Sequence, residues 1–394
     1  MKNNRYYFIL LLFLFPSLIA VAQRARKIHF KSILIDTHND IPEKALDKGI
    51  SFDQSLKGKT HSDLARMKEG GVDAQFFSIW CDGHEPDPYA MANREMDTVM
   101  AWTHRNPDKM EQAFTTEDII RISKQKKLAV LFGVEGGHMM ENDLSKLDTF
   151  YKRGARYMTL TWNNSTSWAT SALDETTKAD SLTHKGLTDF GKQIVKRMNE
   201  LGMLVDLSHV GEQTFWDAIA TTTKPVLVSH SSVYTLCPHR RNLKDEQIKA
   251  VARNGGVIHL NFYSGFLDST FEARSDAFTA RHKMEMDSLK KINPEPYFRE
   301  FYLFEKYSDE VRGLRPPFSL LFDHLDYIVR LVGVDHVGLG SDFDGVNSLP
   351  AGLDGVEDFP KITAELIKRG YRKKEIRKIL GGNLLRVFAA NEKK

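Results

Sequence analysis

Imidazole and carboxylate side chains stand two residues apart in the stretch ILIDTHND, residues 33–40. Alternate residues of a strand point to the same face, so His38 and Asp40 would project together from the end of an apolar strand. Histidine and carboxylate are common ligands of zinc and similar divalent ions. A motif this short also arises by chance, in which case Asp40 would accept backbone hydrogen bonds ahead of Pro42. The pair by itself leaves both interpretations open.

Four more polar residues stand where other apolar runs end: Glu135 in FGVE, His209 in DLSH, His230 in VSH and Asp342 in GSD. Each has a structural alternative. The histidines could be hydrogen-bonded in the core, Glu135 could accept from glycine amides, and Asp342 could cap a turn. Because all of them follow the same kind of run, we favour one site at which they converge. Three histidines and three carboxylates suit two metal ions that share a carboxylate.

Eight short apolar or β-branched runs would position these residues. They begin near residues 33, 72, 128, 156, 203, 225, 255 and 336. Helical patterns lie between them, most clearly at 187–202, 243–256 and 318–333. Alternating strands and helices predict a parallel sheet, and eight such units favour a (β/α)8 TIM barrel of the α/β class over an open sheet. The carboxyl ends of barrel strands meet at one rim, where the polar residues would converge.

The segment 264–317 interrupts this alternation between the seventh run and its helix. It is charged and aromatic, and we expect a helical insertion. One interpretation is a solvated excursion without a chemical role. The other is a lid, because insertions after barrel strands lie over the active-site face.

The N-terminus has the pattern of a secretory signal peptide. Lys2 and Arg5 precede the apolar stretch FILLLFLF, and AVAQ follows it. This arrangement predicts cleavage after Ala22. An uncleaved membrane anchor is the alternative, but the apolar stretch is short for a bilayer span. We therefore expect a signal peptide over 1–22, a single barrel domain over 23–394, no stable membrane anchor, and a protein exported to the periplasm or the cell exterior.

Bulk composition excludes some partners. The chain has 394 residues, of which 41% are hydrophobic and 27% charged, and its formal net charge is +3. These values fit a globular protein and give no sign of nucleic acid as a partner.

The chain resembles the membrane dipeptidase (renal dipeptidase) family of zinc peptidases, a branch of the amidohydrolase-like barrels. The resemblance covers nearly all of 32–391. It rests on the ordered motifs DTHNDIP, FGVEGG, RYMTLTW, GMLVDLSHV, VSHSSVY, RRN, NFY, GLGSDFDG and GNLLRVF. It implies a barrel with two Zn²⁺ ions, a dipeptide substrate and a homodimer.

The resemblance also implies roles for single residues. His38 and Asp40 would bind one zinc, His209 and His230 the other, and Glu135 would bridge them.

Two further residues match the family's substrate-binding and proton-handling positions. Arg241, the second arginine of RRN, matches the residue that holds the carboxylate of the dipeptide. Its alternative is a surface ion pair with Asp245 or Glu246. Asp342 matches the acidic residue that handles protons and the substrate amine.

One position departs from the family. Trp162 stands where members have a histidine that contacts the substrate carbonyl and the developing oxyanion. Indole donates one hydrogen bond but carries no charge, and losing an oxyanion donor typically costs about 10²–10³ in rate. Either Trp162, Asn163 or Asn164 substitutes, or the substrate lies differently, or activity is low. The family's cysteine positions are also incomplete, which implies that Cys81 and Cys237 are free thiols.

The sequence therefore predicts a metallo-dipeptidase in which two metals activate water, Asp342 moves a proton and Arg241 grips the terminal carboxylate. A deaminase or lactonase on the same barrel would explain the ligands but not Arg241. A metal-binding protein with reduced catalysis, suggested by Trp162, is the other alternative.

Overall fold

The computed structural model describes residues 23–293 and 296–393. The expected signal peptide lies outside these residues. Within the described ranges, no helix combines the length and the apolar composition that a membrane crossing requires.

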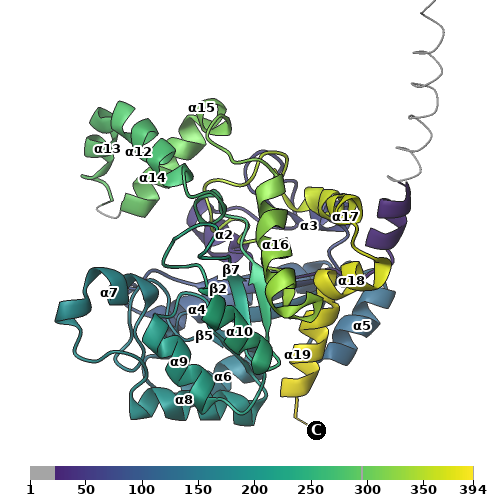
Figure 1. Ribbon diagram of the computed structural model, residues 1–394, viewed down its shortest axis with the longest axis horizontal. Helices are drawn as coiled ribbons and strands as arrows, with labels where there is room; N and C mark the ends of the chain where they lie inside the picture. Colours follow the sequence, from purple (N-terminus) through teal and green to yellow (C-terminus); the bar gives the residue numbers. More distant parts are fainter. Residues whose placement is uncertain (1–22, 294–295, 394) are drawn as a thin grey trace, which may run out of the picture.

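Parallel strands form a nearly closed ring, and the strands that Figure 1 labels lie at the centre of the molecule. In order around the ring they are β1 (Ile35–Asp36), β2 (Ala74–Trp80), β4 (Leu128–Glu135), β5 (Ala155–Thr159), β6 (Leu204–Asp206), β7 (Leu227–Ser231), β8 (Val257–Leu260) and β9 (Val337–Leu339). The ring closes between β9 and β1 through the bridge of Asn39 with Phe343. These strands are the eight that the sequence predicted, so the (β/α)8 TIM barrel is confirmed.

The sheet contains one short strand that the sequence analysis did not anticipate. Strand β3 (Met110–Gln112) pairs with β4 alone and lies outside the ring. Strand β1 is also shorter than expected, because regular pairing with β2 involves only Ile35 and Asp36.

Helices surround the strands, most of them on the outside of the ring and the last one at its amino-terminal end (Figure 1). They are α2 (Ile41–Lys48), α3 (Leu64–Gly70), α4 (Pro88–Arg105), α5 (Thr116–Lys124), α6 (Leu144–Arg153), α7 (Ala172–Thr177), α8 (Asp189–Leu201), α9 (Glu212–Thr221), α10 (Asp245–Arg253), α16 (Ser319–Val332), α17 (Phe359–Lys368), α18 (Lys373–Arg377) and α19 (Asn383–Asn391). The three clearest helical patterns became α8, α10 and α16. Helix α8 begins after Thr188, whose side chain accepts from the Gly191 amide, and ends at Gly202 in the left-handed conformation.

The inside of the barrel changes from apolar to polar along the strands. Near their amino ends, inward side chains such as Phe76 and Leu131 form one cluster with Leu384 and Phe388 of α19. Helix α19 therefore packs against the amino-terminal end of the barrel. Toward the carboxyl ends the same faces carry groups such as Glu135 instead, so functional side chains can gather only at that rim.

The insertion after β8, the seventh strand of the ring, is helical as expected. Its helices are α11 (Ser264–Leu267), α12 (Phe271–Arg281), α13 (Lys283–Leu289), α14 (Pro296–Lys306) and α15 (Ser308–Arg312). Helices α12 to α15 form a lobe at the upper left of Figure 1. The lobe has its own apolar cluster, which comprises Phe271, Phe278, Leu303, Phe304 and Val311.

Candidate active site

The structure brings the predicted metal ligands together at the carboxyl rim of the barrel. Nε2 of His38 lies 3.5 Å from Oδ2 of Asp40 and 3.0 Å from Oε2 of Glu135. Nε2 of His209 lies 2.9 Å from Oε1 of Glu135, and Nε2 of His230 lies 3.4 Å from the same oxygen. All five side chains are buried.

The two oxygens of Glu135 divide the other ligands into two sets. Oε2 faces His38 and also accepts a hydrogen bond from Ser78, whereas Oε1 faces His209 and His230. One carboxylate thus stands between two groups of ligand atoms. This is the arrangement that a shared bridging carboxylate requires.

Hydrogen bonds fix which nitrogen each histidine directs into the site. The Tyr157 hydroxyl donates to the Thr37 carbonyl, so it accepts from Nδ1 of His38 at 2.8 Å. Asn163 Oδ1 accepts from Nδ1 of His209 at 3.2 Å. With Nδ1 protonated, each Nε2 presents a lone pair.

His230 also directs Nε2 into the site, because two consecutive hydrogen bonds hold its Nδ1. Ser229 Oγ donates to Asp206 Oδ2 at 2.6 Å and therefore accepts from Nδ1 of His230 at 2.8 Å. Nε2 of His230 then points toward Nε2 of His209, 3.1 Å away. Asp206 is fully buried and anchors this chain from β6.

These contacts show that a divalent cation fits the site. When the three imidazoles are neutral, their Nε2 lone pairs face one another and the Glu135 carboxylate, and such a group of acceptors is repulsive unless a proton or a metal cation lies among them. Oδ2 of Asp40 is buried and makes no hydrogen bond with the part of the chain that the structure describes, so it too is available as a ligand. The nitrogen and oxygen donors match the preference of zinc.

The packing of β4 against β5 explains how one of these contacts arises. A Cβ on Gly133 would lie 1.9 Å from Cζ of Tyr157, so only glycine leaves room for that ring. Tyr157 consequently extends through the barrel to His38. Tyr157 and Ser78 were not identified from the sequence, because each contacts a residue distant from it along the chain. Ser229 was also missed, although it precedes His230, because its role depends on Asp206 of the neighbouring strand. Asn163 was named only as a possible oxyanion donor and not as a partner of His209.

The backbone is strained at two of the predicted residues. His209 has φ of 62° and Asp342 has φ of 61°, in the left-handed region that non-glycine residues rarely adopt. Such strain costs roughly 1–3 kcal/mol and often marks functional sites. Both residues therefore lie in conformations that the surrounding structure imposes.

Asp342 lies beside the ligand cluster. One of its oxygens and ligand atoms of His38 and Asp40 lie within 4.8 Å of one another. Asn261 donates to its Oδ2 at 2.7 Å. Burial, together with the Asp40 carboxylate, raises the pKa of Asp342 to about 7. A carboxyl group with this pKa can both accept and release a proton near neutrality.

Arg241 is a buried cation that lacks a carboxylate partner among the described residues. Its guanidinium contacts Ser231 Oγ at 3.3 Å and the His230 carbonyl at 3.4 Å, and its Nε has no partner. Burial lowers its pKa to about 10. The alternative ion pair with Asp245 or Glu246 is wrong, because those residues bind Tyr327 and Lys249 instead.

Trp162 follows β5 at the same rim. Its ring packs edge-on against Trp80 at 4.9 Å and lies 6.4 Å from the His209 ring. It is half-buried, so it forms part of the wall beside the metal ligands.

Several of the purely structural interpretations of these residues are wrong. Asp40 precedes α2, but its side chain makes no capping hydrogen bond. Glu135 contacts histidines and Ser78 rather than glycine amides. The expectation that His38 and Asp40 share a strand face is also wrong, because both follow the two-residue strand β1. Their side chains nevertheless lie 3.5 Å apart, immediately before α2. Cys81 and Cys237 are free, as expected.

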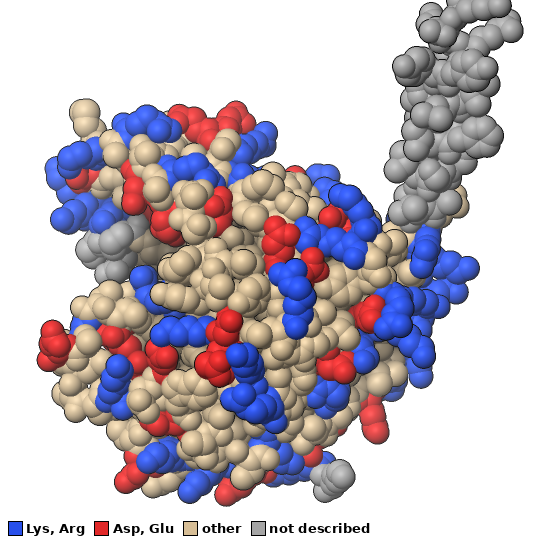
Figure 2. Space-filling model, in the orientation of Figure 1, with Lys and Arg blue, Asp and Glu red and all other residues tan. Residues whose placement is uncertain are grey.

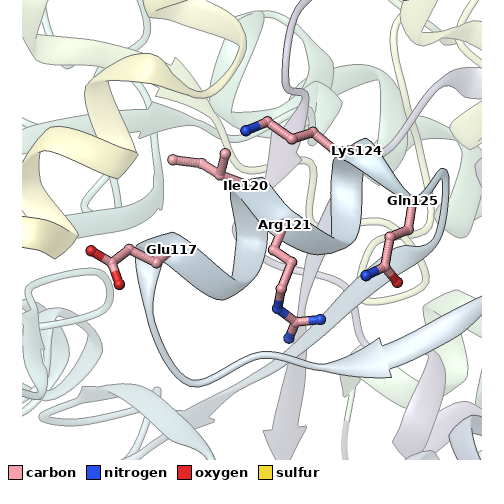
Figure 3. A pocket seen from close by; sticks show the side chains of 5 residues that line it. All are labelled: Glu117, Ile120, Arg121, Lys124 and Gln125. Carbon is pink, nitrogen blue, oxygen red and sulfur yellow. The ribbon is translucent and has the colours of Figure 1, made fainter.

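A separate surface hollow lies along α5 (Figure 3). It is lined by Glu117, Ile120, Arg121, Lys124 and Gln125, none of which belongs to the strand ends. The chemistry is therefore at the rim and not in this hollow.

Comparisons with known proteins identify the family of this chain. The sequence profile of the membrane dipeptidase family (peptidase family M19) matches residues 22–394. The probable dipeptidase PvdM from Pseudomonas aeruginosa superposes with a TM-score of 0.77 at 26% identity, over 94% of this chain and 98% of that one. A metallopeptidase from Rhodobacter sphaeroides, solved with a phosphinate mimic of L-Ala-D-Ala, gives 0.74 at 22% identity, over 92% and 100%. This chain belongs to the membrane dipeptidase family and is a metallo-dipeptidase.

Proposed function

We propose that the chain hydrolyses dipeptides with two zinc ions held at the rim of its barrel. His38 and Asp40 would hold one ion, His209 and His230 the other, with Glu135 between them. The division of ligands between the two Glu135 oxygens supports this assignment. Two zinc ions bound there would polarise the peptide carbonyl and lower the pKa of a water molecule toward neutrality.

Arg241, buried and without a carboxylate partner within residues 23–293 and 296–393, is the observation that carries the choice of substrate. A buried cation without a counter-ion is costly, so this site favours an anionic ligand. A dipeptide offers a carboxylate at a fixed distance from its single peptide bond. Arg241 would bind that carboxylate through charge-assisted hydrogen bonds and place the bond beside Glu135 and Asp342.

Asp342 would move the proton. Its carboxylate accepts the proton released by the attacking water and returns it to the leaving amine. Asn261 holds Oδ2 of Asp342 and thereby fixes the direction of the carboxylate. The other end of the substrate, its free amine, would lie near the same carboxylate.

The two alternatives differ from this proposal in what they leave unexplained. A deaminase or lactonase needs the metal ligands but gives Arg241 no partner. A protein with reduced catalysis would follow if the wall formed by Trp162 offers no oxyanion donor. The face of the molecule in Figure 2 intersperses acidic and basic residues, which supports a small-molecule substrate rather than nucleic acid. The homodimer stays a prediction.

The experiment is a panel of dipeptides assayed with metal-stripped and zinc-loaded protein. L-Ala-D-Ala belongs in the panel, because the Rhodobacter sphaeroides protein was solved with a mimic of it. Each dipeptide is paired with its carboxamide, which lacks the terminal charge. Zinc-dependent hydrolysis of the acids, with little hydrolysis of the amides, is expected.

Arg241→Met should reduce kcat/KM for the acids about 10- to 150-fold, the worth of hydrogen bonds to a charged group, and should remove the preference over the amides. Arg240→Met is the matched control, because Arg240 is the exposed neighbour. Equal turnover of acids and amides by the wild type would contradict the proposal, as would zinc-dependent deamination or lactone opening without peptide hydrolysis.

A further inference from the structure

Contacts with segments of the barrel hold the lobe of α12 to α15 in place. Nζ of Lys48 on α2 forms an ion pair with Glu305 of α14 at 2.8 Å. The ring of Tyr263, which follows β8, packs against Phe271 of α12 at 5.7 Å. Both contacts join the lobe to segments that follow ring strands. The lobe therefore stands over the carboxyl rim (Figure 1).

Helix α14 places Tyr297 against the site. The Tyr297 hydroxyl donates to the Gly345 carbonyl. Gly345 in turn packs on the site carboxylates, because a Cβ there would lie 2.2 Å from Oδ2 of Asp40 and 2.6 Å from Oδ1 of Asp342. The phenol and these two carboxylates are therefore close neighbours around one glycine.

The Tyr297 ring borders the opening of the site. One side packs on Phe301 of the same helix at 4.6 Å, yet the residue remains 40% exposed. Partial burial of the phenol raises its pKa, and the Asp342 and Asp40 carboxylates raise it further. A side chain that is open to solvent and close to both carboxylates lines the entrance, not the outer surface of the lobe.

Tyr297 lies near the position that the free amine of the substrate would occupy. Arg241 comes from the segment between β7 and α10 and would take the terminal carboxylate. Asp342 follows β9 and would face the free amine. Tyr297 lies on the Asp342 side.

We propose that Tyr297 closes the amino-terminal end of the substrate site and thereby restricts hydrolysis to peptides of two residues. This inference rests on the proposed function. A third residue placed before the amine would need the space that the phenol ring occupies. A smaller side chain at this position would open that space, while the dipeptide would keep its contacts with Arg241 and Asp342.

The test compares Ala-Ala with Ala-Ala-Ala, scored for release of the carboxyl-terminal alanine. In Tyr297→Ala the ratio of kcat/KM for the tripeptide to that for the dipeptide should rise at least about tenfold, as expected for relief of a steric exclusion. Tyr297→Phe keeps the ring and should keep the wild-type ratio. Tyr302→Ala is the control, because Tyr302 lies on the same helix and is 48% exposed. Should Tyr297→Ala fail to fold, Tyr297→Leu gives the same comparison.

An unchanged ratio in a folded Tyr297→Ala or Tyr297→Leu protein that still hydrolyses Ala-Ala would overturn this inference alone. An equal rise in Tyr302→Ala would also overturn it, because the effect would then belong to the helix. Absence of dipeptide hydrolysis by the wild type would instead overturn the proposed function and this inference together.

Discussion

The hydroxyl of Tyr157 lies 2.8 Å from Nδ1 of His38 and donates its own proton to the Thr37 carbonyl. This contact makes Nδ1 the protonated nitrogen of His38 and leaves Nε2 for a metal. Hydrogen-bond partners of this kind typically contribute about 10- to 100-fold to metal affinity.

Tyr157→Phe should therefore weaken zinc binding by about that factor without unfolding the protein. Competition with a chromophoric chelator measures the affinity, and circular dichroism checks the fold. Tyr89→Phe is the control, because Tyr89 packs on Phe150, away from the site. Unchanged zinc affinity in Tyr157→Phe would show that the hydroxyl does not orient His38.

The pH dependence of hydrolysis should follow Asp342. Its protonated form cannot accept a proton, so kcat/KM should decline as pH falls through its pKa. Asn261 stabilises the ionised carboxylate, so Asn261→Ala should raise that pKa and move the acidic limb upward by about 1 pH unit. Steady-state measurements of kcat/KM from about pH 5 to about pH 9 give the position of this acidic limb. If the acidic limb of Asn261→Ala lies at the same pH as that of the wild type, then the limb reports another group and not Asp342.

Kinetics can distinguish the two possible roles of Trp162, a wall of the pocket and an oxyanion donor. Its contacts with Trp80 and its distance from His209 favour a wall over an oxyanion donor. Trp162→Phe should then change KM among dipeptides with different side chains and leave kcat nearly constant. A donor used only in the transition state would instead lower kcat. A fall in kcat near the 10²–10³ typical of a lost oxyanion donor would show that the indole N–H acts on the reacting carbonyl.

The sequence could predict the ring of strands, the main helices and the convergence of the ligand-type residues, because these depend on local periodicity and on barrel geometry. It could not predict the partners of His38, His209 and His230. Those contacts depend on how β4, β5, β6 and β7 pack, and Gly133 shows this best, since its importance comes from a tyrosine on the next strand. Tyr297 was missed for the same reason: no periodicity relates α14 to Gly345.

Export is a further prediction, and it concerns residues outside those that the structure describes. The Lys2 and Arg5 flank, the apolar stretch and AVAQ should direct the chain out of the cytoplasm. N-terminal sequencing of the native protein should begin at Gln23. Recovery of chains that begin at Met1 from the soluble cytoplasmic fraction would contradict export.

Titration of metal-stripped protein with zinc, followed by dipeptide hydrolysis at each point, tests the two-metal account most directly. Activity should rise until about two equivalents are bound and then stay constant, because two ligand sets share Glu135. Glu135→Gln should bind less zinc and hydrolyse no dipeptide, since the amide cannot serve as a bridging carboxylate. Full activity with one equivalent, or full zinc content and turnover in Glu135→Gln, would contradict the account.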